Sequence, residues 1–185
     1  MVAAGLGHAE VTMQSMTCGL LLATVCCGTI AVAETPAGEE TVLFVCEHGS
    51  AKSLLAATLF NREAARRHLR FRAIARGTTP DAAPQAATRE RLLRDGMDVT
   101  TFVPQRVTVL DVKSAGAVVA FEVDLAPLNP THRAIARWDD TPPVSGDYRL
   151  ARDAISHSIE RLIQRLQSAE PRQDLPTKAT LAPRY

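Results

Sequence analysis

Cys46 has the residue type and the sequence surroundings of a reactive thiol. It follows the apolar run 41–45 (Thr-Val-Leu-Phe-Val) and begins the segment 46–53 (Cys-Glu-His-Gly-Ser-Ala-Lys-Ser), after which a helical pattern starts. Between a strand end and a helix N-terminus, backbone N–H groups and the helix dipole create positive potential, which lowers the pKa of a thiol and favours the nucleophilic thiolate. The same N–H groups bind oxyanions such as phosphate. The segment therefore predicts a nucleophile and an anion-binding loop together.

Composition narrows the class of protein. The chain has 185 residues, enough for one domain with a hydrophobic core. Its formal net charge of +1 argues against nucleic-acid binding through bulk charge, and an aromatic content of 4% argues against a stacking platform for bases or sugars. We therefore expect no nucleic-acid partner, and we expect neither a metal ion nor another cofactor.

The first 33 residues differ from the rest of the chain. They contain three of the four cysteines, no Lys or Arg, and an apolar stretch at 18–33 that ends in Ala31-Val32-Ala33, the pattern of a signal-peptide cleavage site. This predicts a signal peptide over 1–33 and an exported, periplasmic or secreted protein without stable membrane insertion. No basic residue precedes the apolar stretch, so the alternatives are an uncleaved anchor and a mis-assigned start, the latter with a cytoplasmic location. After cleavage, Cys46 is the single thiol of the mature chain.

Apolar runs of strand length alternate with helical patterns after a linker at 34–40. The run at 41–46 is unbroken, as in a strand buried on both faces, whereas 71–76 largely alternates, as in a strand nearer a sheet edge. Residues 41–168 form the predicted domain, and residues 169–185 form a tail. The predicted strands are 41–46, 71–76, 117–121 and 132–138, and the predicted helices are 53–69, 84–95, 107–115 and 147–168.

This alternation predicts a single α/β domain built on a parallel four-stranded sheet with helices on both faces. In such sheets, binding sites lie beyond the carboxyl ends of the strands. Cys46 and the pair Asp139-Asp140, which follows the last predicted strand, both come at carboxyl ends. We therefore expect the two loops to face each other although they are far apart in the sequence.

The chain resembles the low-molecular-weight protein tyrosine phosphatases and the arsenate reductases that share their fold. That family has a strand, then the signature Cys-x5-Arg-Ser, then a helix, and residues 42–53 follow this order. Gly77-Thr78 matches a Gly-Thr after the second strand of the family. Trp138-Asp139-Asp140 with Pro142 resembles its acid loop. The resemblance covers about residues 41–168.

The resemblance implies a role for each matching residue. Cys46 would attack phosphorus, Lys52 would bind the oxyanion from the position of the family's Arg, and Ser53 would hydrogen-bond the thiolate. Asp140 would protonate the leaving group as general acid, with Asp139 as the alternative. The implied phosphate-binding loop consists of Glu47, His48, Gly49, Ser50, Ala51 and Lys52.

The sequence departs from the family pattern at several of these positions. Lys52 keeps the positive charge of the Arg but lacks the planar fork that matches two phosphate oxygens. Gly49 replaces an Asn that braces the loop, and Ala75 replaces the Ser that supports this Asn. Brace and support are missing together, so we expect the loop to be held in another way. His48 is a candidate substitute, either as a donor to the ligand or as a partner of the thiolate. Thr141 separates the acid from the proline that usually follows it.

Three functions agree with these residues. The first is a phosphate monoester hydrolase of the tyrosine phosphatase type, with a cysteinyl-phosphate intermediate. The second is an arsenate reductase, which would need an external thiol because no cysteine follows Cys46. The third is a catalytically silent oxyanion-binding module. The expected partners are a phosphate- or arsenate-type oxyanion and, as a further candidate, a phosphorylated protein.

Overall fold

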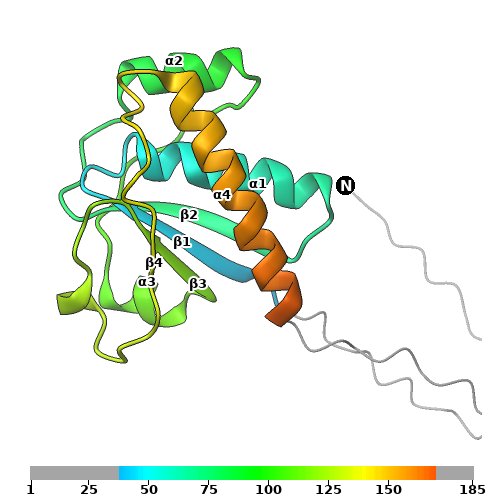
Figure 1. The fold of residues 1–185 in the computed structure, drawn as a ribbon. Coiled ribbons are helices and arrows are strands. Elements are labelled where there is room, and N and C mark those ends of the chain that lie inside the picture. Colours follow the sequence, from blue (N-terminus) through cyan, green and yellow to red (C-terminus); the bar gives the residue numbers. More distant parts are fainter. Residues whose placement is uncertain (1–37, 170–185) are drawn as a thin grey trace, which may run out of the picture. The chain divides into compact units, whose positions relative to one another are not determined.

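The structure is a computed structural model that describes residues 38–169, with a parallel sheet between helices (Figure 1). The predicted signal peptide, residues 34–37 of the linker and residues 170–185 of the tail lie outside the described residues. The elements in chain order are β1 (Glu40–Cys46), α1 (Lys52–Arg66), β2 (Phe71–Gly77), α2 (Ala86–Arg94), α3 (Val109–Ser114), β3 (Ala117–Ala120), a 3-10 turn (Ala126–Leu128), β4 (Ala136–Arg137) and α4 (Tyr148–Ala169).

The four strands pair in the order β2-β1-β3-β4, and every pair is parallel. The predicted fold class, a parallel four-stranded α/β sheet, is therefore confirmed. β2 lies at an edge, as its alternating sequence indicated. In the register of the sheet, Cys46 lies opposite Gly77, and Val45 lies opposite Ala120.

The central strand β1 is buried on both faces, which explains its unbroken apolar sequence. Val42 and Phe44 belong to a core cluster with α1 and α4, whereas Leu43 and Val45 belong to a second cluster that includes Val112 of α3. Figure 1 shows α1 and α4 on one face of the sheet and α3 on the other. Because successive side chains of a strand point to opposite faces, one strand supplies the centre of both cores.

The last predicted strand, 132–138, is much shorter in the structure, where β4 contains only Ala136 and Arg137. The preceding residues form a turn instead. His132 has a positive φ of 49°, and the Asn129 amide donates to the Arg133 carbonyl oxygen at 3.0 Å while its oxygen accepts from the Arg133 N–H at 3.1 Å. These local bonds satisfy backbone groups that an extended strand would direct to its neighbour.

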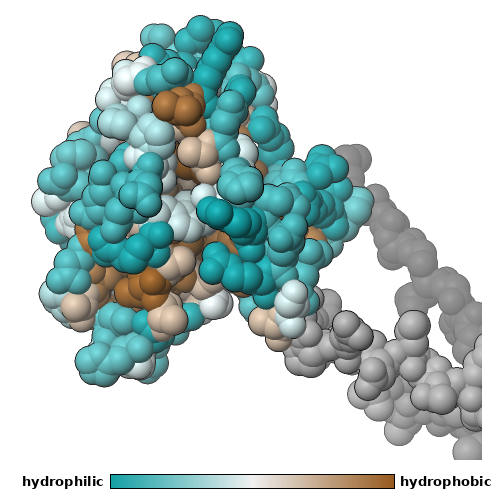
Figure 2. Space-filling view, viewed as in Figure 1, coloured by the Kyte–Doolittle hydropathy of each residue, from teal (hydrophilic) through white to brown (hydrophobic). Residues whose placement is uncertain are grey.

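Helix α4, which matches the helix predicted at 147–168, packs on the domain through one apolar stripe that includes Ala151, Ile155, Ile159 and Leu162. Among the described residues, no helix is long and apolar enough to cross a membrane. Figure 2 shows that the visible face of the described region is mostly hydrophilic, with hydrophobic residues between the polar ones.

The strand order changes direction between β1 and β3. From β1 the chain goes to β2 on one side and then returns to β3 on the other. Loops at the carboxyl ends of two such strands diverge and leave a crevice, which is where open α/β sheets bind ligands. The fold therefore places Cys46, the last residue of β1, at the expected binding position.

Candidate active site around Cys46

The Cys46 thiol lies among polar groups of its own loop and of the start of α1. Its Sγ is 3.1 Å from the Ser53 Oγ and accepts a hydrogen bond of 3.2 Å from the Gly49 backbone N–H. Cys46 is 7% exposed and Ser53 is completely buried, so few water molecules compete with these contacts. The structure brings the predicted nucleophile and the predicted thiolate partner together. Cys46 is also the single cysteine of residues 38–169.

The loop after Cys46 leads directly into α1 and leaves backbone donors free. Ala51, which precedes the helix, gives no side-chain cap, and the first turn of α1 contains no acidic residue. Within the described part of the chain, the N–H groups of Ser50, Ala51 and Lys52 donate to no other protein group. Uncapped N–H groups at a helix N-terminus, beside a thiol, form a binding position for an oxyanion.

The segment after β2 holds the Cys46 loop through main-chain hydrogen bonds. The Thr78 N–H donates to the Cys46 carbonyl oxygen at 3.1 Å, the Thr79 N–H to that of Glu47 at 2.8 Å, and the Asp81 N–H to that of His48 at 3.0 Å. The pairing of β1 with β2 thus continues beyond both strands. This explains how the loop keeps its shape without the Asn–Ser pair of the family.

Two glycines make this continued pairing sterically allowed. Gly49 has φ +67°, and a Cβ at this position would lie 2.9 Å from the Gly77 nitrogen. A Cβ on Gly77 would lie 2.8 Å from the Gly49 nitrogen. Such approaches are closer than real Cβ contacts, so both positions require glycine. Gly49 is therefore the residue that lets the loop lie against the backbone of β2.

Asp81 makes the side-chain contacts of this brace. Its carboxylate accepts a hydrogen bond from the buried Ser50 hydroxyl, and its Oδ1 is 3.4 Å from His48 Nδ1. The other ring nitrogen of His48 is 3.7 Å from a Glu47 carboxylate oxygen. Both ring nitrogens of His48 therefore face carboxylates and not the thiol. Its suggested roles as a donor to the ligand or as a partner of the thiolate stay predictions.

Lys52 forms an ion pair that the sequence reasoning did not anticipate. Its ammonium lies 2.6 Å from a Glu122 carboxylate oxygen, and only 12% of the Lys52 side chain is exposed. Glu122 is the second residue after the end of β3, next to the buried Phe121, and has a positive φ of 54°. The rule that sites lie beyond strand ends, which singled out Cys46 and Asp139, applies equally to Glu122 and would have identified it.

A cavity of about 190 Å³ opens over this arrangement. Its lining includes Cys46, Lys52 and Glu122, together with Gln85 before α2 and the segment 143–145 before α4. Loops from the ends of β1 and β3 thus meet the loop before α4, as expected for a site at the carboxyl edge. Neither Gln85 nor 143–145 was singled out by the sequence analysis.

Neither of the two candidate acids, Asp139 and Asp140, belongs to the lining of this cavity. Asp139 accepts a 2.7 Å hydrogen bond from the Glu122 N–H and forms an ion pair of 2.9 Å with Arg137. The hydrogen bond from Glu122, and then that from Arg137, lower the pKa of Asp139 below its usual value. Asp140 is exposed, and no described residue forms a hydrogen bond or ion pair with its carboxyl group. The role of Asp140 as general acid stays a prediction.

A metal-dependent site was not expected, and within residues 38–169 no group of three His, Cys, Asp or Glu side chains is placed to bind a metal ion. The chemistry that the described arrangement offers is that of a thiolate, backbone N–H donors, one ammonium and nearby carboxylates. These are the groups that bind an oxyanion and attack it.

No protein-family model matches this sequence, and no curated protein is similar to it by sequence. Solved structures do share its fold. YfkJ from Bacillus subtilis has a TM-score of 0.64 and 21% identity over 74% of this chain and 100% of that chain. A thioredoxin-dependent arsenate reductase from Corynebacterium glutamicum has a TM-score of 0.62 and 18% identity over 74% of this chain and 66% of that chain. A low-molecular-weight protein tyrosine phosphatase from T. tengcongensis has a TM-score of 0.56 and 18% identity over 68% of this chain and 99% of that chain.

The chain therefore has the fold of the low-molecular-weight tyrosine phosphatases and arsenate reductases, as the resemblance in sequence implied. An arsenate reductase of this fold, 17% identical, has been solved in a phosphate-binding state. Both activities occur among these structures, so the shared fold does not distinguish a hydrolase from a reductase.

Proposed function

We propose that this protein is a phosphate monoester hydrolase of the tyrosine phosphatase type. The observation that supports it most is the Cys46 thiol, which contacts Ser53 and the Gly49 N–H beside uncapped amides at the start of α1. A nucleophile and an anion-binding loop in one place satisfy the two requirements of phosphoryl transfer, which are positioning and charge stabilisation.

In the first step, the substrate phosphate binds to the loop N–H groups and to the Lys52 ammonium. The Cys46 Sγ attacks phosphorus, the bond between phosphorus and the leaving oxygen breaks, and a protein acid protonates that oxygen. The product is a cysteinyl-phosphate and a free alcohol or phenol. In the second step, water attacks phosphorus and gives a proton to the carboxylate that the acid became in the first step. The bond between phosphorus and sulfur breaks, which releases inorganic phosphate and a thiolate that the Ser53 hydroxyl, 3.1 Å from Sγ, stabilises.

We assign the acid role to Asp140, as the resemblance implies. Asp139 is less suited, because its lowered pKa keeps it ionised and two donors already occupy its carboxylate. Asp140 has no such partner among the described residues. Two carboxyl groups, those of Glu47 and Glu122, line the cavity with Cys46, so these residues are the alternative donors.

Lys52 would supply the positive charge that an Arg supplies in the family. An ammonium has three N–H donors, and one is used by Glu122, so two remain for the oxyanion. The Glu122 carboxylate also fixes the direction of the Lys52 side chain. The same carboxylate reduces the net positive charge of the loop, and this observation favours the silent oxyanion-binding module as the second candidate function.

An arsenate reductase remains a third candidate. Cys46 is the single described cysteine, so reduction would need a thiol from outside the described residues. Export through the signal peptide is also part of the proposal, and it is tested by detecting the protein in the periplasmic or extracellular fraction of expressing cells. Recovery of unprocessed protein in the cytoplasm would contradict export.

The decisive experiment compares hydrolysis of p-nitrophenyl phosphate by the parent protein, Cys46→Ser and Lys52→Arg. Turnover that requires Cys46 and survives Lys52→Arg supports the phosphatase. No turnover together with thermal stabilisation by phosphate supports the binding module, and arsenate consumption that depends on an added thiol supports the reductase. Full activity of Cys46→Ser would overturn the mechanism.

A further inference from the structure

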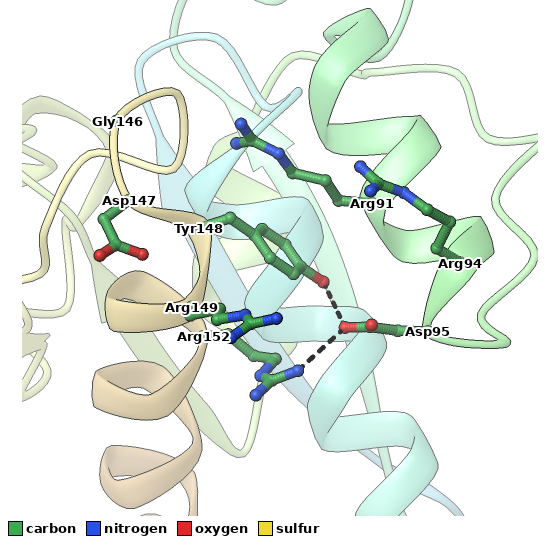
Figure 3. A pocket seen from close by; sticks show the side chains of 8 residues that line it. All are labelled: Arg91, Arg94, Asp95, Gly146, Asp147, Tyr148, Arg149 and Arg152. Atoms are coloured by element: carbon green, nitrogen blue, oxygen red, sulfur yellow. Dashed lines mark hydrogen bonds and ion pairs between the residues drawn. The ribbon is translucent and has the colours of Figure 1, made fainter.

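A second cavity, of about 570 Å³, lies between the C-terminus of α2 and the N-terminus of α4 (Figure 3). Its lining residues differ from those of the Cys46 cavity without exception. We call it the arginine pocket, because guanidinium groups dominate it. It is lined by Arg91, Arg94, Arg149 and Arg152, together with Asp95, Gly146, Asp147 and Tyr148.

The acidic groups of the arginine pocket already have partners inside the protein. Asp95 Oδ2 accepts a 2.7 Å hydrogen bond from the Tyr148 hydroxyl and lies 3.4 Å from Arg152 Nη1. Asp147 Oδ1 accepts a 3.1 Å bond from the Leu150 N–H in the first turn of α4. Burial and the bond to Asp95 raise the pKa of Tyr148, so its hydroxyl stays neutral. Neither aspartate of the lining pairs with Arg91, Arg94 or Arg149, whereas Arg152 pairs with Asp95 and, outside the lining, with Asp153 at 3.2 Å.

Two of the arginines, Arg94 and Arg149, are available for a ligand, whereas Arg91 has contacts within the protein. Arg91 donates to the Val144 carbonyl oxygen at 2.7 Å and lies 5.6 Å from the centre of the Tyr148 ring. Arg94 makes one long contact, 3.5 Å to the Glu90 carbonyl oxygen, and no described carboxylate pairs with Arg94 or Arg149. Figure 3 shows these groups reaching in from both helices, with Tyr148 between them.

We propose that the arginine pocket binds a phosphate group carried by a larger molecule. Four guanidinium groups and two carboxylates leave a net charge of +2 in the lining, which matches the charge of about −1.5 to −2 on a phosphate monoester. Guanidinium forks match phosphate oxygens in geometry, and the N-terminus of the 22-residue helix α4 adds positive potential. A volume of 570 Å³ lies in the range of pockets for small organic molecules, so it accommodates more than a free phosphate ion.

The segment before α4 connects the arginine pocket to the Cys46 cavity. Pro143, Val144 and Ser145 line the Cys46 cavity, and the next residues, 146–148, line the arginine pocket. The Arg91 side chain in one pocket also binds the Val144 backbone in the other. A ligand on the arginines therefore contacts the segment that shapes the Cys46 cavity. This inference does not depend on catalysis by Cys46.

The test uses the ¹⁵N-labelled full chain at constant ionic strength. Inorganic phosphate and a short phosphoserine peptide with otherwise uncharged side chains are titrated separately. Amide resonances of 146–152 report on the arginine pocket, and those of 47–53 report on the Cys46 loop. We expect saturable shifts at 146–152 with both probes, and an affinity for the peptide at least equal to that for phosphate.

The variant Arg94→Gln/Arg149→Gln should weaken binding at 146–152 at least tenfold and leave the shifts at 47–53 within twofold. The matched control, Arg89→Gln/Arg165→Gln, removes the same charge from the same two helices at exposed positions outside the arginine pocket and should change binding less than twofold. Absence of saturable shifts at 146–152, equal weakening by the control, or binding of phosphate with exclusion of the peptide would overturn the proposal. Because 47–53 are read separately, failure here is distinguishable from failure of the Cys46 site.

Discussion

The Lys52 ammonium and the Glu122 carboxylate form an ion pair of 2.6 Å that connects the start of α1 to the carboxyl end of β3. The pair places a positive and a negative charge at the edge of the Cys46 loop. Lys52 is thereby fixed in direction, and its attraction for an oxyanion is reduced. The balance between these two effects can be measured.

Glu122→Gln should strengthen inhibition by inorganic phosphate. The substitution removes a carboxylate that repels the anion and competes for Lys52, and a gain of about 1 kcal/mol corresponds to roughly fivefold tighter binding. The measurement is the inhibition constant of phosphate in aryl phosphate hydrolysis, or its dissociation constant if turnover is absent. Asp124→Asn is the control, because it removes one charge near the end of β3 without contacting Lys52. Weaker phosphate binding by Glu122→Gln would mean that fixing Lys52 matters more than repulsion.

Lys52→Ala should lower kcat/KM for an aryl phosphate by roughly 10²–10³, the usual loss when one electrostatic contact to the transition state is removed. Lys52→Arg should retain activity at or above the parent level, because the fork can bind Glu122 and one phosphate oxygen together. Both variants are compared by steady-state kinetics. Parent-level kcat/KM in Lys52→Ala would show that the loop amides suffice without the cation.

Asp140→Asn should lower kcat by about 10²–10³ for a poor leaving group such as phenol and much less for p-nitrophenol, because only the poor leaving group needs a proton. Asp139→Asn should preserve this difference between substrates, since the lowered pKa of Asp139 keeps it ionised in the working range. The measurement is kcat against leaving-group pKa. If Asp140→Asn has no effect and Glu122→Gln abolishes hydrolysis of the poor substrate, Glu122 is the donor.

Gly49→Ala should destabilise the protein more than Gly96→Ala. Both glycines have positive φ, 67° and 75°, but a Cβ on Gly49 would lie 2.9 Å from the Gly77 backbone, whereas a Cβ on Gly96 has nothing within 4 Å. We expect a loss of about 1 kcal/mol for Gly96→Ala from conformation alone and about 3 kcal/mol or more for Gly49→Ala. Denaturant unfolding measures both values, and equal losses would contradict the close packing.

Glu63→Gln should reduce stability by about 1 kcal/mol at neutral pH and have little effect near pH 2. The hydrogen bond from Arg66, and then that from Arg67, lower the pKa of Glu63 to about 2 from its usual 4.5, although partial burial acts the other way. The folded state therefore binds protons less readily, so the stabilisation is complete above about pH 4.5 and is lost as the pH falls towards 2. Chemical unfolding against pH measures the effect. Glu90→Gln, an exposed carboxylate without a described ion pair, should show no such dependence.

The sequence predicted the parts of the fold that depend on local pattern. Burial follows a simple repeat of apolar residues in three elements. The repeat is an unbroken apolar run in β1, an alternation in β2 and a stripe along one face in α4. The prediction of a strand at 132–138 was too long, because local hydrogen bonds between Asn129 and Arg133 compete with strand pairing before the short β4. Alternation cannot reveal such a bond, because it depends on a single side chain.

The candidate site was predicted unevenly for a similar reason. Cys46, Lys52 and Ser53 are close in sequence, so one loop brings them together. Glu122 and Asp81 reach the same loop only through the order of the strands and the close approach of Gly49 to Gly77. Contacts of this kind depend on tertiary structure. In the sequence, only the glycine at position 49 indicates that the loop lies close to another backbone.

The main-chain brace of the Cys46 loop has a consequence for how this protein can diverge. Hydrogen bonds from Thr78, Thr79 and Asp81 to loop carbonyl oxygens do not depend on which side chains the loop bears. Two glycines are then the strict requirement of this brace, whereas the side chains at positions 48 and 52 take no part in its main-chain hydrogen bonds. Substitutions that change the charge or hydrogen-bonding groups of these side chains can therefore occur without disturbing the backbone that holds Cys46 in place.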